Sequence, residues 1–99
     1  MYFVIFGTDK PGVLAIREET RPKHRVHLRE TKRKVKVHHG GPTLGDDGKS
    51  MNGTLLVVEA DNLEEVRGFV ADDPYSKAGI FEKIEIRPWA WTTGVPDGK

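Results

Sequence analysis

Two short segments of the chain, YFVIF at residues 2–6 and TLLVV at residues 54–58, are apolar at odd and even positions alike. Both are rich in β-branched and aromatic residues, which favours β-strands. Successive side chains on a strand point to opposite faces of a sheet, so these two strands carry apolar side chains on both faces. The sheet that contains them must therefore be covered on both sides.

The order of the remaining segments predicts the topology of this sheet. Helical spacing of apolar or small residues begins at Val13, an alternating strand KVKVHH follows at residues 34–39, and a second helical pattern covers residues 62–72. The order β-α-β-β-α-β predicts an α+β ferredoxin-like sandwich, in which both helices cover one face of an antiparallel sheet. We expect one domain over residues 1–91, closed by a strand that runs from FEKIEI to PWAW, and a tail over residues 92–99.

Pro22 lies inside the first helical pattern. Proline removes a backbone N–H and is favoured in the first turn of a helix rather than in its interior. We therefore predict that Thr20 caps a second helical segment that runs to about Arg33.

Turn and cap signals mark the second half of the chain. Residues 40–53, GGPTLGDDGKSMNG, are rich in turn-forming residues and predict a mobile connection that forms a lip over a pocket. Asp61 and Glu64 have the spacing of a capping box, which makes Asp61 the predicted N-cap of the second helix. The apolar stripe of that helix comprises Leu63, Val66, Phe69 and Val70.

The helices of this topology cover one face of the sheet and leave the other face, with its apolar side chains, uncovered. We predict that a second copy of the chain packs on this helix-free face and gives a homodimer. The alternative is that the C-terminal segment PWAWTTGVPDGK, residues 88–99, folds back as the cover.

Composition excludes several classes of function. The chain has 99 residues, no cysteine and a formal net charge of +1, which excludes disulfides, thiolate catalysis and cysteine-bound metals. Its net charge provides no overall attraction for nucleic acid or for a membrane. The opening run MYFVIFG is too short for a signal sequence, and no apolar run approaches the roughly 18 residues of a membrane span. We expect a soluble, cytoplasmic protein that needs no cofactor.

Asp72 and Asp73 fall in the last turn of the second predicted helix or just after it. The helix macrodipole disfavours a carboxylate at that end by some tenths of a kcal/mol to ~1 kcal/mol. Pro74 biases the backbone of Asp73 to an extended form and turns it away from the helix axis. Asp72 is expected to face solvent. The unfavourable position of the Asp73 carboxylate is explained if a positively charged side chain lies opposite it across a cleft.

His24 shares a helical stripe with Leu28, so its imidazole should face the sheet or its rim, where it requires a hydrogen-bond partner. The simplest interpretation is a satisfied core histidine. Imidazole also gains and loses protons near neutral pH, which suits proton transfer. The end of the first helix and the end of the second approach one rim of the predicted sheet, so Asp73 can meet His24 and fix its tautomer, as in a general-base pair.

Three stretches carry a resemblance to a known family. They are RPKH with Leu28, GGP at residues 40–42, and ADDPYSKAGIFEKIEIRPW at residues 71–89. Together they resemble the YCII-related domain family, whose pattern contains Arg-x-x-His-x-x-x-Leu, a Gly-Pro turn, an Asp-Pro-Tyr…Ala-Gly segment and a last strand that ends in Pro-Trp. The resemblance covers residues 1 to about 91.

The resemblance implies a ferredoxin-like dimeric α/β barrel with a pocket in which His24 and Asp73 act as a catalytic pair. The family is similar in fold to muconolactone isomerases, and some relatives act on lactone-type substrates. This chain departs from the pattern in RETKRKVKVHHGG, which is more basic than the family leads one to expect. The residues that we assign to substrate binding on this basis and from their place beside the motifs are Arg21, Gly41, Pro42, Ser50 and Tyr75.

Basic residues crowd residues 21–36, where Glu30 is the only acid. A solvated helix face is the simplest interpretation, and attraction of an acidic small molecule is the main alternative. Nucleic-acid binding is disfavoured because no aromatic residue is interleaved for base stacking.

The four histidines raise the question of a metal site. His24 and His27 lie three apart on a helix, and the aspartates at residues 46–47 could add oxygen ligands. His38 and His39 are adjacent on a strand and are expected to point to opposite faces. No recognised ligand spacing is present, so we expect no metal.

These observations favour a small enzyme that uses His24 and Asp73 for isomerase- or lyase-type acid/base chemistry on a carboxylate- or lactone-bearing metabolite, with Arg21 holding an anionic group. The alternative is a non-catalytic ligand-binding or accessory module, in which the same pair only ties two helices together.

Overall fold

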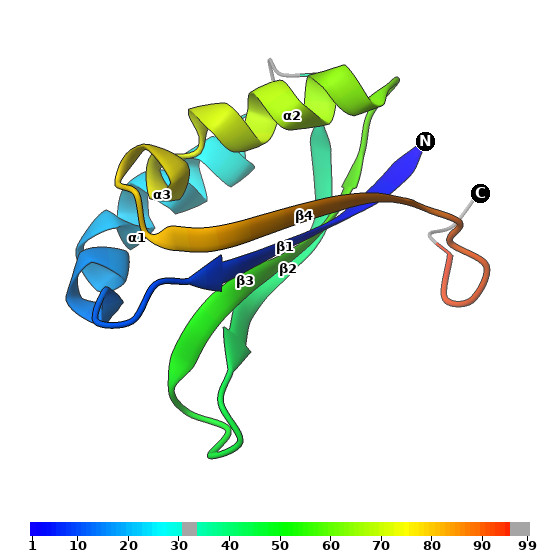
Figure 1. Cartoon of the computed structure of the whole chain (residues 1–99). Helices are drawn as coiled ribbons and strands as arrows, with labels where there is room; N and C mark the ends of the chain where they lie inside the picture. Colours follow the sequence, from blue (N-terminus) through cyan, green and yellow to red (C-terminus); the bar gives the residue numbers. More distant parts are fainter. Residues whose placement is uncertain (31–33, 96–99) are drawn as a thin grey trace.

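The structure is a computed structural model of the chain and describes residues 1–30 and 34–95. Strands pair antiparallel in the order β2-β3-β1-β4, and the helices lie on one face of this sheet (Figure 1). This arrangement confirms the predicted ferredoxin-like α+β fold. The elements in chain order are β1 (Tyr2–Asp9), α1 (Leu14–Leu28), β2 (Lys36–Leu44), β3 (Met51–Glu59), α2 (Leu63–Asp72), α3 (Pro74–Lys77) and β4 (Phe81–Trp89).

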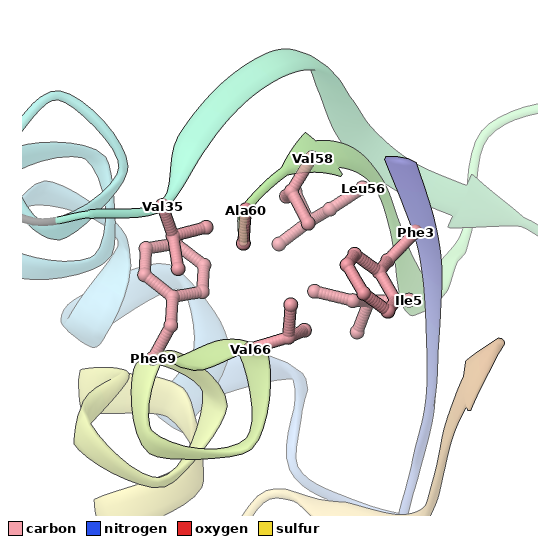
Figure 2. Packing of buried hydrophobic residues seen from close by; sticks show 8 residues of the cluster. All are labelled: Phe3, Ile5, Val35, Leu56, Val58, Ala60, Val66 and Phe69. Atoms are coloured by element: carbon pink, nitrogen blue, oxygen red, sulfur yellow. The ribbon is translucent and has the colours of Figure 1, made fainter. Parts of the chain in front are cut away.

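The core lies between the helices and the inner face of the two central strands. Alternate residues of β1 and β3 are buried there because they point toward the helices, and Val66 and Phe69 of α2 meet them (Figure 2). Each fully buried apolar side chain of this size stabilises the fold by roughly 1.5–3 kcal/mol. The buried cluster comprises Phe3, Ile5, Val35, Leu56, Val58, Ala60, Val66 and Phe69.

The first helix is continuous, contrary to the predicted break. α1 runs through Pro22 and ends at Leu28, with no new segment capped at Thr20; residues 31–33, which include the predicted end at Arg33, lie outside the described residues. Proline deprives the carbonyl of Glu18 of its helical donor. Both residues are exposed, so water can satisfy that carbonyl and the helix continues.

The strands β2 and β3 are longer than predicted and take up most of the expected connection. Residues 40–44 belong to β2, residues 51–53 belong to β3, and a turn closes between Gly45 and Ser50, where the two backbones bond at 2.8 Å. Pro42 is compatible with this because β2 is an edge strand, where a missing N–H costs no ladder bond on its outer side. Pairing with β3 therefore overrides the local turn signals.

The cap of α2 also differs from the prediction. Asn62, not Asp61, is the N-cap, and its side chain accepts a hydrogen bond from the backbone N–H of Glu65 at 2.9 Å. The helix begins one residue later than the capping-box spacing suggests. Both Asn and Asp suit this position, so sequence alone could not choose between two adjacent candidates.

Trp91 covers one corner of the helix-free face. Its ring lies 5.2 Å from Tyr2 and 5.4 Å and 5.5 Å from His38 and His39, measured between ring centroids. The register of β2 against β3 shifts between Val37 and His39, and this irregularity places both histidines near the same tryptophan. The expectation that His38 and His39 point to opposite faces is therefore wrong.

The centre of the helix-free face remains apolar and exposed. Phe6 of β1 and its cross-strand neighbour Leu55 of β3 expose 43% and 36% of their surface. Trp89 at the end of β4 exposes 40% and stacks on Trp91 at the covered corner. The segment after β4 covers a corner of this face and leaves its centre open. In the described part of the chain, no helix combines the length and the apolar character that crossing a bilayer requires.

Candidate functional site

His24 and Asp73 meet inside the protein. Nδ1 of His24 lies 2.8 Å from Oδ1 and 3.0 Å from Oδ2 of Asp73, and both residues are buried, with 6% and 4% of their surface exposed. The predicted contact between the two side chains is confirmed. Because the carboxylate accepts at Nδ1, it favours the tautomer that carries the proton there and leaves Nε2 as an acceptor.

The position of Asp73 is explained by a helix that the sequence analysis did not foresee. Asp73 follows α2 with an extended backbone and is at once the N-cap of α3, where its Oδ1 accepts from the backbone N–H of Tyr75 at 2.9 Å. Pro74 occupies the first helical position, which proline favours. The carboxylate therefore points at the donors of a helix start, and Asp72 is exposed as expected.

Tyr75 joins this pair to the rest of the site. Its ring stacks on the His24 imidazole, with 3.9 Å between centroids and 18° between planes. The guanidinium of Arg17 lies over the same tyrosine ring, 4.6 Å from its centroid. Stacking and the cation–π contact fix the imidazole plane as well as its distance from Asp73.

One nitrogen of His24 is accessible. Nε2 of His24 has no hydrogen-bond partner among residues 1–30 and 34–95. In these ranges, Ser76 Oγ is the side-chain polar atom that is both fully buried and without a partner. Nε2 is therefore not fully buried. His24 lines a pocket, and Nε2 is the atom that can act on a molecule bound there.

The pocket has a volume of about 360 Å³ and lies between α1 and the β2–β3 end of the sheet. Arg21, Gly41, Pro42 and Tyr75, which were predicted to bind substrate, all line it together with His24. Ser50 is not among the described lining residues. The other lining residues are Arg17, Arg25, Leu28, Arg29, Gly40, Met51 and Thr54.

The charge of the pocket is positive. It is lined by arginines at intervals of four residues, about one helical turn apart, along α1 and at its C-cap: Arg17, Arg21, Arg25 and Arg29. None of the described lining residues is acidic. Nη2 of Arg21 donates to the thioether sulfur of Met51 at 3.0 Å, a weak acceptor. A cleft lined by one sign of charge concentrates ligands of the opposite sign, so the pocket suits an anion.

Arg17 and Thr54 are functional candidates that the sequence analysis missed. Nε and Nη2 of Arg17 donate to Asp9 at 2.7 Å and 2.9 Å, and Nη2 also donates to Thr54 Oγ at 2.6 Å. Arg17 exposes 2% of its surface and Thr54 exposes 4%. The available signal was the spacing of Arg17, four residues before Arg21 and seven before His24, which places all three on one side of α1.

Two of the other three histidines make polar contacts within the fold, whereas His39 is exposed beside Trp91. Nε2 of His27 lies 2.8 Å from the carbonyl oxygen of Phe69 and the two rings stack, which ties α1 to α2. Nε2 of His38 lies 2.8 Å from Glu59. Over the described ranges, no group of three or more histidine or acidic side chains has the arrangement of a metal site.

The wall of the pocket on β2 is thin. Gly40, Gly41 and Pro42 also line a hollow of about 240 Å³ together with Leu55 and Val57 of the helix-free face. A Cβ at Gly40 would lie 2.6 Å from the side chain of Leu56, so this position requires glycine or a shift of the leucine. At Gly41 a Cβ would meet nothing within 4 Å.

The sequence has relatives over almost its whole length. It matches the YCII-related domain over residues 1–90. Protein YciI of Escherichia coli is 27% identical over 94 residues, which cover 90% of this chain and 96% of that protein. An uncharacterized protein of Haemophilus influenzae is 28% identical with the same coverage.

Two solved structures share the fold of this chain. The 5-chloro-2-hydroxyhydroquinone dehydrochlorinase TftG of Burkholderia phenoliruptrix, in complex with 2,5-dihydroxybenzoquinone, is 38% identical with a TM-score of 0.79, over 91% of this chain and 94% of TftG. A protein of Arabidopsis thaliana shares the fold at 16% identity and a TM-score of 0.54, over 93% of this chain and 95% of its own. The match over residues 1–90 shows that this chain belongs to the YCII-related domain family.

Proposed function

We propose that this protein is a small acid–base enzyme of the isomerase or lyase type. In this proposal His24 transfers the proton, and Asp73 orients the imidazole of His24 and stabilises its positive charge. The observation that carries the proposal is the bond between Asp73 and Nδ1, which leaves Nε2 of His24 accessible from a positively charged pocket. General acid–base catalysis of this kind contributes typically 10²–10⁴-fold to a rate.

The proposed step begins at a carbon next to a carbonyl group. Nε2 of His24 accepts the proton, the electron pair of the C–H bond forms a C=C bond, and the carbonyl oxygen takes the negative charge. Return of the proton to another carbon completes an isomerisation. In an elimination, a leaving group departs with its bonding electrons. A chlorinated hydroquinone reacts from its keto form, in which the carbon that bears chlorine carries the added hydrogen. Nε2 then accepts a hydroxyl proton, a second C=O bond forms and chloride leaves, so no oxidant or reductant is required.

The substrate is a small anion that bears a carbonyl group, such as a carboxylate, a lactone acid or an ionised hydroxyquinone. The pocket of about 360 Å³ suits a ligand of this size. Arg21 would bind the anionic group, because its contact with Met51 Sδ is weak and a charged oxygen is a much better acceptor. The likeness to TftG, a dehydrochlorinase seen with 2,5-dihydroxybenzoquinone, supports this class of substrate.

His24→Ala tests the proposal. With 5-chloro-2-hydroxyhydroquinone as the substrate probe, we expect chloride release by the wild type and a fall in kcat of about 10²–10⁴-fold in the variant. Chloride release is followed by ion-selective electrode and folding by circular dichroism. His27→Ala is the matched control, because His27 is buried on the same helix and bonds a backbone carbonyl outside the pocket. Equal turnover by His24→Ala and wild type would refute the mechanism.

Asp73→Asn separates the proposal from a purely structural role. Asparagine caps helices as well as aspartate does, so α3 should still form, whereas the carboxylate that orients His24 is lost. We expect kcat to fall by two to four orders of magnitude with a small change in melting temperature. Asp72→Asn makes the same charge change at the exposed neighbour and serves as the control. An accessory module, in which the pair only ties helices, predicts lower stability and no change in any activity.

We also propose that the protein is a homodimer formed through the helix-free face. Its exposed centre, with Phe6 and Leu55, is the kind of apolar surface that soluble domains bury in an interface. Trp91 leaves this centre open, so a second copy remains the better cover.

A further inference from the structure

We propose that Thr54 Oγ–H and Nη1 of Arg17 form a donor pair that binds the carbonyl oxygen of the substrate and stabilises the negative charge that develops there. This inference rests on the proposed acid–base function and adds the group that receives the charge while His24 takes the proton. Neither residue belongs to the pair His24–Asp73, yet both line the same pocket.

The hydroxyl hydrogen of Thr54 is available to a ligand. Oγ accepts a hydrogen bond of 2.6 Å from Nη2 of Arg17, so its own hydrogen must point away from the guanidinium. The structure gives this hydrogen no acceptor among the residues that it describes. Thr54 is buried and lines the pocket, and the pocket is where an acceptor can reach it.

Arg17 supports this donor from behind and supplies a second one. Nε and Nη2 of Arg17 are held by Asp9 and Thr54. Nη1 has no hydrogen-bond partner in the described ranges and is not fully buried there, so it can donate to a ligand. A donor that is itself bonded to a cation is strengthened, because hydrogen bonds in a chain polarise one another. Asp9 balances the charge of Arg17, which lowers the cost of burying it.

The arrangement divides the chemistry between two sides of the pocket. His24 accepts the proton at Nε2, and the electrons that it leaves behind move to the carbonyl oxygen at the donor pair. Such preorganised donors are costly to lose, since removal of one oxyanion donor typically lowers kcat by about 10²–10³-fold. Thr54 is therefore a catalytic residue, and Arg17 is in part a positioning residue that holds the Thr54 hydroxyl in orientation.

Binding of 2,5-dihydroxybenzoquinone, a vinylogous acid that is ionised at neutral pH, measures the donor pair without turnover. Thr54→Val has the same shape and lacks the hydroxyl, so we expect it to weaken binding about 10- to 100-fold in an absorbance titration. Thr54→Ser keeps the hydroxyl and should bind within about threefold of wild type. Thr54→Ala leaves room for a water at Nη2 of Arg17 and replaces the valine variant if that one does not fold.

A comparison on the wild type alone gives a second test. 2,5-Dimethoxybenzoquinone has a similar ring but no charge. Because the donor pair and the arginines bind a charged oxygen more strongly than a neutral one, we expect it to bind at least about tenfold more weakly than the dihydroxy compound. Equal affinity for the two quinones overturns the inference, as does wild-type affinity in both Thr54→Val and Thr54→Ala.

His24→Ala distinguishes failure of this inference from failure of the proposed function. The variant keeps Thr54 and Arg17, so it should still bind 2,5-dihydroxybenzoquinone while it loses chloride release. If chloride release does not depend on His24 but quinone binding depends on Thr54, the acid–base proposal is wrong and the donor pair stands. If release depends on His24 and not on the Thr54 hydroxyl, the donor pair is wrong.

Discussion

Asp47 holds the turn between β2 and β3 through a set of hydrogen bonds. Ser50 Oγ donates to Oδ2 at 2.5 Å, and the backbone N–H groups of Lys49 and Ser50 each donate to Oδ1 at 2.9 Å. These bonds lower the pKa of Asp47 from 3.8 to about 2, with the Ser50 side chain as the largest cause. Ser50 therefore has a structural partner in the turn, and a role in substrate binding stays a prediction.

A pH titration tests this network. Because the folded pKa lies below the ordinary value, the carboxylate bonds are fully present above pH 3.8 and are lost as the pH falls through about 2. We expect a carboxyl carbon NMR midpoint near 2 for Asp47, and a higher midpoint in Ser50→Ala, where the backbone bonds remain. Lys49→Gln removes no bond to Asp47 and should leave the midpoint nearly in place. An unchanged midpoint in Ser50→Ala would contradict the assignment.

The pair His24–Asp73 was predictable, and the donor pair was not. His24 lies on an inward helical stripe, Asp73 stands at a helix end that disfavours a carboxylate, and the family resemblance points to both residues. Arg17 is charged, and such residues are seldom buried without partners, so its burial was not expected. Thr54 opens a predicted buried strand, but its sequence context does not pair it with Arg17. The partners of Arg17 lie on other elements, Asp9 on β1 and Thr54 on β3. A local sequence pattern cannot show contacts between residues so far apart in the chain.

At the scale of elements, the start of α2 tests which residue caps a helix. Asn62 accepts the backbone bond from Glu65, so Asn62→Ala should lower the free energy of unfolding by about 1 kcal/mol. Asp61→Ala, one residue earlier, should change it by less than about 0.5 kcal/mol. Chemical denaturation of both variants measures the difference. A larger loss in Asp61→Ala would restore the cap predicted from the sequence.

The existence and type of the elements were better predicted than their ends. The strand and helix periods identified the four strands and both longer helices, but α1 passes through Pro22 and β2 extends through residues 40–44. For β2, pairing with β3 outweighs the local turn signal; for α1, the carbonyl that Pro22 deprives of a donor is open to water, so the helix continues. α3 was missed because its four residues are too short for a period to appear.

At the scale of the whole molecule, the helix-free face decides the state of assembly. Leu55→Lys places a charge in the exposed centre of that face, so we expect the proposed dimer to dissociate to a monomer, since burying an unpaired charge is costly. Val26→Lys makes the same change on α1, where Val26 exposes 68% of its surface, and should remain dimeric. Size-exclusion chromatography with light scattering gives the masses. A monomeric wild type, or dissociation of both variants alike, would refute the proposed interface.

The wall formed by Gly40, Gly41 and Pro42 borders the arginine-lined pocket on one side and the hollow beside Leu55 on the other. Two of these residues have no side chain, so a protomer resting on the outer hollow would be separated from a bound ligand by little more than a layer of peptide backbone. We expect ligand binding in the pocket and dimer formation on the outer face to be thermodynamically linked through this wall. This linkage is reciprocal: the factor by which dimer formation raises the affinity for ligand equals the factor by which the ligand raises the affinity of one protomer for the other.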